Sequence, residues 1–458
     1  MGPPIDSTSD SPEPSPSASP PTGQQAPPAA DEPPGLASEP EPSPIASSPA
    51  EQQAPTVSDA LPAPASTPPA PWTTRLGRVF RHPYFYILLF FLATRGALTI
   101  GGVISRRVLE PMLGPEFYLW RYSKSVWLDV WSVWDSGWYL DIAQYGYNAH
   151  YHSLLPKLTE TGQLNYAFFP LYPMMLRGLG WLIGDYPLAG IIISNVFLLV
   201  ACVFLYKLVC LSDGPKAGVR AAKHLLLFPV GFILSGVFTE STFLALAIMT
   251  FYFARRDWWV AAGITGFFLA LTRSVGVILV APLAYEYLQA RSFQVSRIRA
   301  NILALGLIPL GLGLFMAYNY HLTGDWLGFV HIQVAWHRQF INPLKSLVSG
   351  LRSADLYVQF PAWFVLVVLA MAVFFCRRLG LSYFVLTLML VLVPLASSLP
   401  ERSQMPSMPR CTMAAFPLFI LLAQITRDQR LDWSLSCLLA ALQSILMVFW
   451  SMGFPLVI

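Results

Sequence analysis

Long apolar runs follow one another along most of the chain, and they constrain the fold more than any other feature. A helix needs about 17 to 25 mostly apolar residues to cross the roughly 30 Å hydrocarbon core of a bilayer. Such runs begin soon after Arg75, and 55% of the 458 residues are apolar while only 12% are charged. Ordinary soluble domains have about 25% charged residues. The composition therefore excludes a soluble globular protein and predicts an all-α polytopic membrane protein.

We expect about 11 transmembrane helices. Their expected positions are near 84–104, 188–210, 223–239, 241–254, 258–273, 275–290, 301–320, 360–376, 381–399, 411–426 and 433–453. The pairs 223–254 and 258–290 are short, so each has room for a broken or re-entrant helix. The stretch 168–185 is also apolar, but a span there would reverse the side of the basic residues at 207–223. We therefore expect a helix that lies at the membrane interface in this stretch, begun by Pro170 or Pro173.

Lysine and arginine clusters predict the orientation of these spans. The clusters occur at 75–81, 207–223, 255–256, 291–299, 377–378 and 427–430. The positive-inside rule assigns such loops, and with them the N-terminus, to the cytoplasm. The opposite loops, 105–187, 321–359 and 400–410, contain tryptophans, histidines and acids that chemistry can use. The active face is therefore expected to point out of the cytoplasm.

The first 74 residues have a different composition from the rest. They contain 21 of the 40 prolines and nine acidic residues, but no lysine or arginine. Such a segment cannot bury enough apolar surface to offset the entropy of ordering. We expect a disordered acidic cytoplasmic tail at 1–74 and one transmembrane domain at 75–458. Proline-rich ligand motifs are the alternative role for the tail.

The most unusual local sequence is WSVWDSGWYLDIAQYGY, residues 131–147. On a helix, Asp135, Trp138 and Tyr139 share one face, whereas Asp141 points elsewhere. A carboxylate among aromatic rings is desolvated, which suits a general base. Aromatic rings such as Trp134 also stack on the apolar faces of sugars. The alternative is an interfacial aromatic belt in which Asp135 caps a helix.

This element resembles the signature of the PIG-V-like mannosyltransferases, the family of GPI mannosyltransferase 2 and its bacterial relatives within the GT-C superfamily. WDSGWYLDIAQYGY is followed about twenty residues later by FFPLYP. The segments 238–277, with FTEST and LTRSVG, and 409–423, with PRCTMAAFPLF, are similar to the family's central and last regions. The resemblance covers nearly everything after residue 84. Cys411 departs from it, since a tyrosine is expected after Arg410, and the tail is not a family feature.

The resemblance implies a GT-C-type bundle with a large first external loop that contains interfacial helices. It also implies an enzyme that moves a sugar, mannose in this family, from a polyprenyl-phosphate-linked donor to a hydroxyl of a glycolipid or glycan acceptor on the non-cytoplasmic face. The family's functional acid falls on Asp135. The expected membrane is the plasma membrane for a bacterial protein, which the loop's closeness to bacterial relatives favours, and the endoplasmic reticulum for a eukaryotic one.

Three arginines are candidates to hold the departing phosphate, because a phosphate that gains charge needs cations beside it. Arg273 and Arg410 stand at external ends of expected spans, and Arg338 lies in the loop after the seventh span. Simple snorkelling to the interface is the alternative for each. Glu240 is a second acid near the site, expected to orient the acceptor, or else to occupy the first turn of a helix capped by Thr239.

No cofactor is predicted, and a divalent metal is possible but unsupported. His321, His331 and His337 do not have the spacing of helix-face zinc ligands. The five cysteines show no CxxC pair, and the basic excess after residue 74 is loop charge rather than a nucleic-acid footprint.

A transporter or lipid flippase is the competing function, because eleven spans fit it equally well. It predicts charges within spans and internal repeats with broken helices at matching positions. Arg95 is nearly alone within an expected span, and its partner is not evident from the sequence. An inactive scaffold of the same fold is a third possibility.

Overall fold

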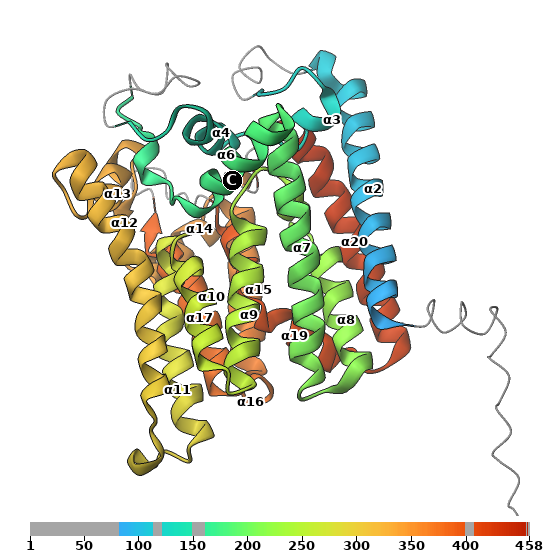
Figure 1. The fold of residues 1–458 in the computed structure, drawn as a ribbon. Helices are drawn as coiled ribbons and strands as arrows, with labels where there is room; N and C mark the ends of the chain where they lie inside the picture. Colours follow the sequence, from blue (N-terminus) through green and yellow to red (C-terminus); the bar gives the residue numbers. More distant parts are fainter. Residues whose placement is uncertain (1–81, 113–120, 149–160, 399–406, 455, 457–458) are drawn as a thin grey trace, which may run out of the picture. The chain divides into compact units, whose positions relative to one another are not determined.

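The computed structural model describes residues 82–112, 121–148, 161–398, 407–454 and 456 (Figure 1). The chain divides into two units, Met1–Pro68 and Pro69–Ile458. The first unit, and with it the tail expected at 1–74, lies outside the described residues.

Helices make up nearly all of the regular structure, and Figure 1 labels most of them. In chain order they are α2 (Pro83–Leu109), α3 (Val126–Asp129), α4 (Ser136–Tyr145), α6 (Leu171–Ile183), α7 (Tyr186–Cys210), α8 (Gly214–Leu227), α9 (Glu240–Arg255), α10 (Trp259–Ala270), α11 (Val280–Ala290), α12 (Leu307–Thr323), α13 (Gly328–His331), α14 (Pro343–Leu351), α15 (Leu356–Phe374), α16 (Cys376–Leu379), α17 (Leu381–Leu395), α18 (Met408–Thr412), α19 (Pro417–Ile425) and α20 (Gln429–Ser451).

Short 3₁₀ helices and one small sheet complete the described elements. The 3₁₀ helices are η1 (Glu110–Met112), η3 (Asn165–Ala167), η4 (Gly231–Ser235), η5 (Ser274–Leu279), η6 (Val295–Arg297), η7 (Ala300–Gly306) and η8 (Ile332–Trp336). Strands β1 (Gln339–Phe340) and β2 (Ser397–Ser398) pair antiparallel, with Gln339 opposite Ser398.

Five helical segments are long and apolar enough to cross a membrane: α2, α7, the continuous segment Ala300–Thr323, α15 and α20. Three shorter apolar segments, α10, Ser274–Ala290 and α17, fall on further expected spans. The chain is thus a multi-pass membrane protein. Helices α9 and α19 occupy the two remaining helical positions with 16 and 9 residues. The count of eleven crossings stays a prediction.

The segment expected as a span near 223–239 is a broken helix, one of the two outcomes that the sequence allowed. Helix α8 ends at Leu227, and Phe228 has an extended backbone with ψ of 140°. Pro229 follows, and a residue before proline is disfavoured from the α conformation. The chain then runs through η4 before α9 begins, and all of these residues are buried.

Side chains from α2 and α20 satisfy the carbonyl groups that this break leaves open. The Arg95 guanidinium donates to Leu226 O at 2.6 Å and to Gly231 O at 3.0 Å. The Gln443 amide donates to Leu226 O at 3.1 Å and to Phe228 O at 2.7 Å. Irregular backbone at membrane depth is tolerated only when protein groups satisfy it. Arg95 therefore has the internal partners that its place within a span requires.

The apolar stretch 168–185 forms a helix that is too short to cross a bilayer. Helix α6 has 13 residues and starts directly after Pro170, whereas a crossing needs about 20. It buries Tyr172 and Leu176 and leaves Trp181 80% exposed. It packs against α4 at the upper end of Figure 1. This agrees with an interfacial helix.

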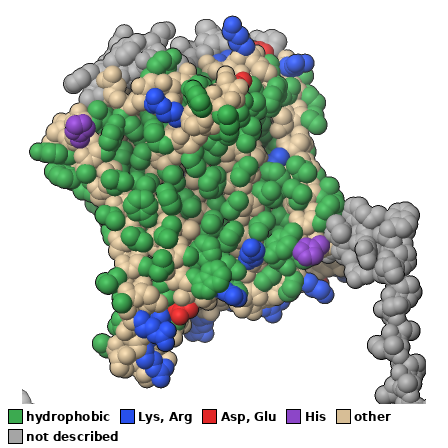
Figure 2. Space-filling view, viewed as in Figure 1, with side chains coloured by type: hydrophobic (Ala, Val, Ile, Leu, Met, Phe, Trp, Pro, Cys, Tyr) green, Lys and Arg blue, Asp and Glu red, His purple; other side chains and the backbone are tan. Residues whose placement is uncertain are grey.

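The basic clusters that alternate along the sequence meet at the other end of the bundle. Arg255 pairs with Glu286 at 2.7 Å, and Lys223 pairs with Asp432. The ends of α9 and α11, which carry Arg255 and Glu286, lie at the bottom of Figure 1. Figure 2 shows hydrophobic side chains over the middle of this face, with lysines and arginines mainly toward its ends. The alternation on which the predicted orientation rests is thus present, while the side of the membrane stays a prediction.

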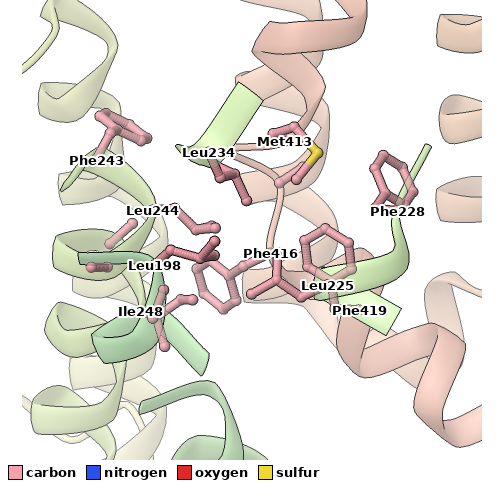
Figure 3. Close-up of a cluster of buried hydrophobic side chains, with 14 of the residues drawn as sticks. Leu198, Leu225, Phe228, Leu234, Phe243, Leu244, Ile248, Met413, Phe416 and Phe419 are labelled. Atoms are coloured by element: carbon pink, nitrogen blue, oxygen red, sulfur yellow. The ribbon is translucent and has the colours of Figure 1, made fainter. Parts of the chain in front are cut away.

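Helix α9 lies at the centre of the packing. Twelve of its 16 residues are buried, including Phe243, Leu244 and Ile248. Figure 3 shows Leu244 and Ile248 facing Leu198 of α7 and Phe416, just before α19. A helix that is apolar on every side is held in a core rather than at a surface. Its first residue, Glu240, is consequently fixed in position at the end where α4 and α6 lie.

Candidate active site

A pocket of about 390 Å³ opens where the start of α4, the end of α10, the η8 segment and α18 come together. Its lining side chains are mostly aromatic or basic: Trp134, Asp135, Tyr139, Phe168, Phe169, Arg273, Trp336, Arg338 and Arg410, with Ala167, Thr272, Ser274, Gln333 and Ser407 between them. These residues come from segments more than 200 positions apart, and we call this space the site pocket.

Asp135 faces the site pocket at the start of α4. It occupies the N-cap position, but its side chain makes no capping hydrogen bond. One carboxylate oxygen, Oδ2, lies 2.8 Å from a guanidinium nitrogen of Arg410. The side chain is 23% exposed, and its other oxygen has no partner among the described residues. Asp135 is therefore an acid held at one oxygen and open at the other, rather than a helix cap.

The backbone just before Asp135 is unusual. Trp134 has a left-handed φ of 56°, which is costly for a bulky residue and tends to occur at functional sites. Its carbonyl accepts a hydrogen bond from the Tyr122 hydroxyl at 3.3 Å. A side chain at Gly137 would come within 2.2 Å of that hydroxyl, so this position needs glycine for close approach. The WDSGW element therefore holds a turn that aims Asp135 into the pocket.

Glu240 holds two of the arginines from behind the pocket. Its Oε1 lies 2.8 Å from a guanidinium nitrogen of Arg273 and 3.0 Å from Nε of Arg410. The glutamate is 5% exposed, and its Oε2 has no hydrogen-bond partner among the described residues. Thr239 makes no side-chain cap to this helix. Glu240 is thus a buried anchor for two guanidinium groups rather than a pocket-lining residue.

The carboxylates keep both anchored arginines firmly protonated. Burial alone would lower the pKa of Arg410, but Asp135 and Glu240 outweigh that effect and raise it above its usual value. Arg273 has the same balance: burial lowers its pKa and Glu240 raises it, with a net rise. Arg410 also lies over the Phe238 ring, 5.4 Å from its centre. The ion pairs therefore fix the positions of Arg273 and Arg410 before any ligand binds.

Arg338 is different, because it lines the pocket without an ion-pair partner in the part of the chain that the structure describes. The β1–β2 pair begins at the next residue, Gln339, and fixes this loop beside the end of α17. Burial lowers the pKa of Arg338 most. Cys411 and Asp135 oppose this effect, Arg410 and Arg273 add to it, and the net shift is downward. A guanidinium nevertheless stays charged in proteins. Arg338 is an available cation inside a partly closed pocket.

The charges around the pocket sum to one positive unit. Three guanidinium groups, from Arg273, Arg338 and Arg410, face two carboxylates, from Asp135 and Glu240. Burial and the charge of Glu240 raise the pKa of Tyr139 above its ordinary value, so its hydroxyl stays protonated. A single negative charge would complement this arrangement.

A second pocket of about 270 Å³ continues from the first. The two share Ala167, Phe169, Arg273, Ser274, Gln333 and Arg338. The second extends along α17 to Leu390, Val393 and Pro394. An apolar branch therefore leaves the site pocket at the two arginines.

The structure brings six of the eight sequence-predicted residues into the pocket lining. The two that do not line it are Glu240, already placed behind it, and Trp138. Trp138 is buried and stacks on Phe168, with ring centres 5.3 Å apart. Asp141, expected to point elsewhere, is buried and accepts a hydrogen bond from Asn165 at 2.8 Å. Its place is structural.

Sequence reasoning missed several lining residues. Trp336 and Gln333 line the pocket from the segment just before Arg338, and Phe168 lines it from the FFPLYP element. The signals were present, since AWHRQF and FFPLYP both stand out as aromatic motifs. Neither motif shows on its own that the two segments meet.

The described residues hold no group of three or more histidine, cysteine, aspartate or glutamate side chains suited to a metal ion. Of the histidines, His331 pairs with Asp325 at 2.6 Å, away from the site pocket.

No protein-family model matches the sequence, and no curated protein matches it. Among solved structures, ArnT from Cupriavidus metallidurans bound to undecaprenyl phosphate is 12% identical, with a TM-score of 0.47 over 77% of this chain and 62% of that one. The Archaeoglobus fulgidus oligosaccharyltransferase with a tethered acceptor peptide is 11% identical, with a TM-score of 0.38 over 82% of this chain and 56% of that one. The chain thus spans about three fifths of the length of these proteins.

Proposed function

We propose that the protein is an integral-membrane glycosyltransferase. It transfers a sugar from a polyprenyl-phosphate-linked donor to an acceptor hydroxyl of a glycolipid or glycan. One observation carries this proposal. The site pocket contains both a carboxylate with one unpaired oxygen, Asp135, and a guanidinium without an ion-pair partner in the described structure, Arg338. The pocket lies among helix ends of a membrane bundle. Mannose as the sugar rests on the sequence resemblance to the PIG-V-like family.

Asp135 serves as the general base. The acceptor hydroxyl gives its proton to the open oxygen of Asp135 while its own oxygen bonds to the anomeric carbon of the sugar. The bond between that carbon and the phosphate oxygen breaks, and the electron pair leaves with the phosphate. A positioned base contributes typically 10²- to 10⁴-fold to such a step. Attack from the face opposite the phosphate inverts the anomeric centre.

The arginines serve the phosphate. A sugar linked to polyprenyl phosphate is a phosphodiester with one negative charge, which matches the single positive unit of the pocket. Negative charge moves from Asp135 to the departing phosphate during the reaction, because Asp135 takes up the proton. Arg410 forms an ion pair with Asp135 before the step. It is well placed to stabilise the negative charge on the departing phosphate as Asp135 becomes neutral. Arg338 and Arg273 stand where the apolar branch begins.

The pocket walls suit a sugar with an apolar carrier. Trp134, Tyr139 and Trp336 provide aromatic faces within the site pocket. The branch toward Leu390 and Val393 offers an apolar path for the first isoprene units of the carrier. Donor phosphate at the arginines would then place the sugar between the branch and Asp135.

A transfer assay tests this proposal. The purified full chain is reconstituted in vesicles and supplied with radiolabelled mannose linked to polyprenyl phosphate, or with the same sugar linked to a nucleotide diphosphate. We expect product only from the polyprenyl-phosphate donor. Transfer from the nucleotide-linked sugar alone would contradict the proposal, and movement of the lipid across the bilayer without transfer would favour a flippase.

A further inference from the structure

A large basic pocket lies at the end of the bundle opposite the site pocket. Its volume is about 1150 Å³, and it is bounded by the end of α9, the end of α11 and the loop that leads to η7. We call it the distal pocket. Five arginines line it: Arg255, Arg256, Arg291, Arg297 and Arg299.

Two of these arginines are already neutralised. Arg255 pairs with Glu286 at 2.7 Å, and Arg291 pairs with Asp257 at 3.1 Å. Arg291 is also held over the Tyr287 ring, 3.6 Å from its centre. These two ion pairs hold one wall of the distal pocket in place.

The other three arginines form no direct ion pair among the residues that the structure describes, although the charge of Arg299 also acts on Asp257. Arg297 and Arg299 are exposed at the rim, and Arg256 lies over the Trp258 ring, 5.6 Å from its centre. With five arginines and two acids, Asp257 and Glu286, in its lining, the distal pocket carries three net positive charges. Ser296 adds a hydroxyl group at its wall, whereas the Ser212 hydroxyl already donates to Asp213 at 2.7 Å.

Large apolar side chains stand exposed beside these arginines. In the loop RSFQVSRIR, Phe293 is 57% exposed and Val295 is 80% exposed. Apolar residues that alternate with arginines in this way suit the boundary between acyl chains and headgroups, where the apolar groups enter the membrane and the cations stay at phosphate level.

The backbone around the distal pocket is held in unusual conformations. Asp257, Ser292 and Phe293 have left-handed φ values of 59°, 53° and 56°. The other non-glycine residues with positive φ in the described ranges are Trp134, His337 and Ser407, all in or next to the site pocket. Such strain persists where the surrounding structure over-determines it, and it tends to mark binding sites.

We propose that the distal pocket binds the headgroup of an anionic phospholipid. Its phosphate contacts Arg256, Arg297 and Arg299, and its chains lie toward Phe293 and Val295. Basic pockets between membrane helices are suited to such headgroups. The three arginines line one concave pocket. Arginines that served only as ordinary loop charge would be dispersed over the surface. The inference does not depend on the proposed transferase activity.

Native mass spectrometry of the full chain in detergent tests the inference, with phosphatidylglycerol and phosphatidylcholine as probes. We expect the wild-type protein to retain phosphatidylglycerol in preference to phosphatidylcholine. The double substitution Arg297→Gln with Arg299→Gln should weaken that retention about thirtyfold, roughly fivefold per arginine. Arg297→Lys with Arg299→Lys should restore most of it, because the charge returns.

The matched control is Arg377→Gln with Arg378→Gln. Like Arg297 and Arg299, these arginines are close in sequence, exposed and at the same end of the bundle, but they do not line the distal pocket. Their replacement should leave retention within twofold, and both glutamine pairs should unfold at the wild-type temperature. Equal losses in the two pairs, or full retention in the first, would overturn the site. Displacement of the lipid by millimolar inorganic pyrophosphate would identify a soluble-anion site instead.

Discussion

At the scale of single residues, the site divides into groups that are anchored and one that is free. Glu240 and Asp135 anchor Arg410, and Glu240 also anchors Arg273, whereas Arg338 has no such partner in the described structure. Removing one member of a buried ion pair leaves its partner unpaired, which commonly costs about 3 to 5 kcal/mol. Removing a free cation leaves nothing unpaired. Stability and donor use should therefore respond differently to these arginines.

Alanine substitutions at Arg338 and Arg410 should separate these two roles. We predict that Arg338→Ala raises the KM for the donor about ten- to a hundredfold, because a charge-assisted phosphate contact contributes roughly 1.5 to 3 kcal/mol. Its melting temperature should stay within about 2 °C of wild type. Arg410→Ala should lose donor use to a similar extent and also melt several degrees lower. Kinetics and thermal unfolding of the same preparations provide the comparison.

Lysine at position 338 serves as the control, since it keeps the charge but lacks the planar fork. It should recover part of the donor affinity. If Arg338→Ala used the donor as well as wild type does, Arg338 would be an interfacial arginine without a role in the pocket.

The sequence predicted Asp135 and its aromatic setting because these residues are neighbours along the chain. It could not show that Trp138 would be covered, because Phe168 and Trp336, which pack against its ring and line the site pocket, come from distant segments. In the structure Asp135 precedes α4 and follows a left-handed Trp134. The anchoring role of Glu240 could not be foreseen either, since Arg273 lies 33 positions away and local patterns carry no such information.

At the scale of elements, the break between α8 and α9 is the feature that hydropathy misrepresents. The segment 223–239 is uniformly apolar, so its average does not reveal where the backbone stops being helical. Pro229 gave the local signal. The partners that make the break tolerable, Arg95 and Gln443, lie more than 130 and 210 positions away.

Arg95→Met tests this account of the break. The substitution places an apolar side chain of similar length in the span. It removes the hydrogen bonds that the Leu226 and Gly231 carbonyls accept from Arg95. A buried polar group that loses its partner costs about 1 to 3 kcal/mol, so we predict a clearly lower melting temperature in detergent. Arg107→Met is the matched control, because Arg107 lies on the same helix and is exposed. Equal melting of the two variants would show that Arg95 does not support the break.

At the scale of the whole second unit, the helices place two kinds of polar surface at opposite ends. One end holds the site pocket, and the other holds the ion pairs of the basic clusters and the distal pocket. The alternation of these clusters along the sequence predicted that separation, because consecutive crossings must exchange ends. The number of full crossings was harder to predict, since α9, α10 and α19 are shorter than a bilayer-spanning helix.

Labelling of introduced cysteines tests the orientation. In a variant without native cysteines, we predict that Asp325→Cys, at the site end, reacts with a membrane-impermeant maleimide added outside intact cells. Arg377→Cys, at the other end, should react only after the membrane is permeabilised. Arg377 is exposed, and the Asp325 side chain is 40% exposed. The reverse pattern would place the site pocket in the cytoplasm and contradict the positive-inside prediction.

The central claim is that Asp135 removes the acceptor proton, and its replacement by asparagine tests it most directly. Asparagine is nearly isosteric but does not accept a proton. We predict that Asp135→Asn lowers the turnover of sugar transfer at least about a hundredfold, while the protein still inserts and binds the donor. Asp185→Asn is the control, because Asp185 lies at the site end and caps α7 with an oxygen that asparagine retains. Transfer at the wild-type rate by Asp135→Asn would contradict the account.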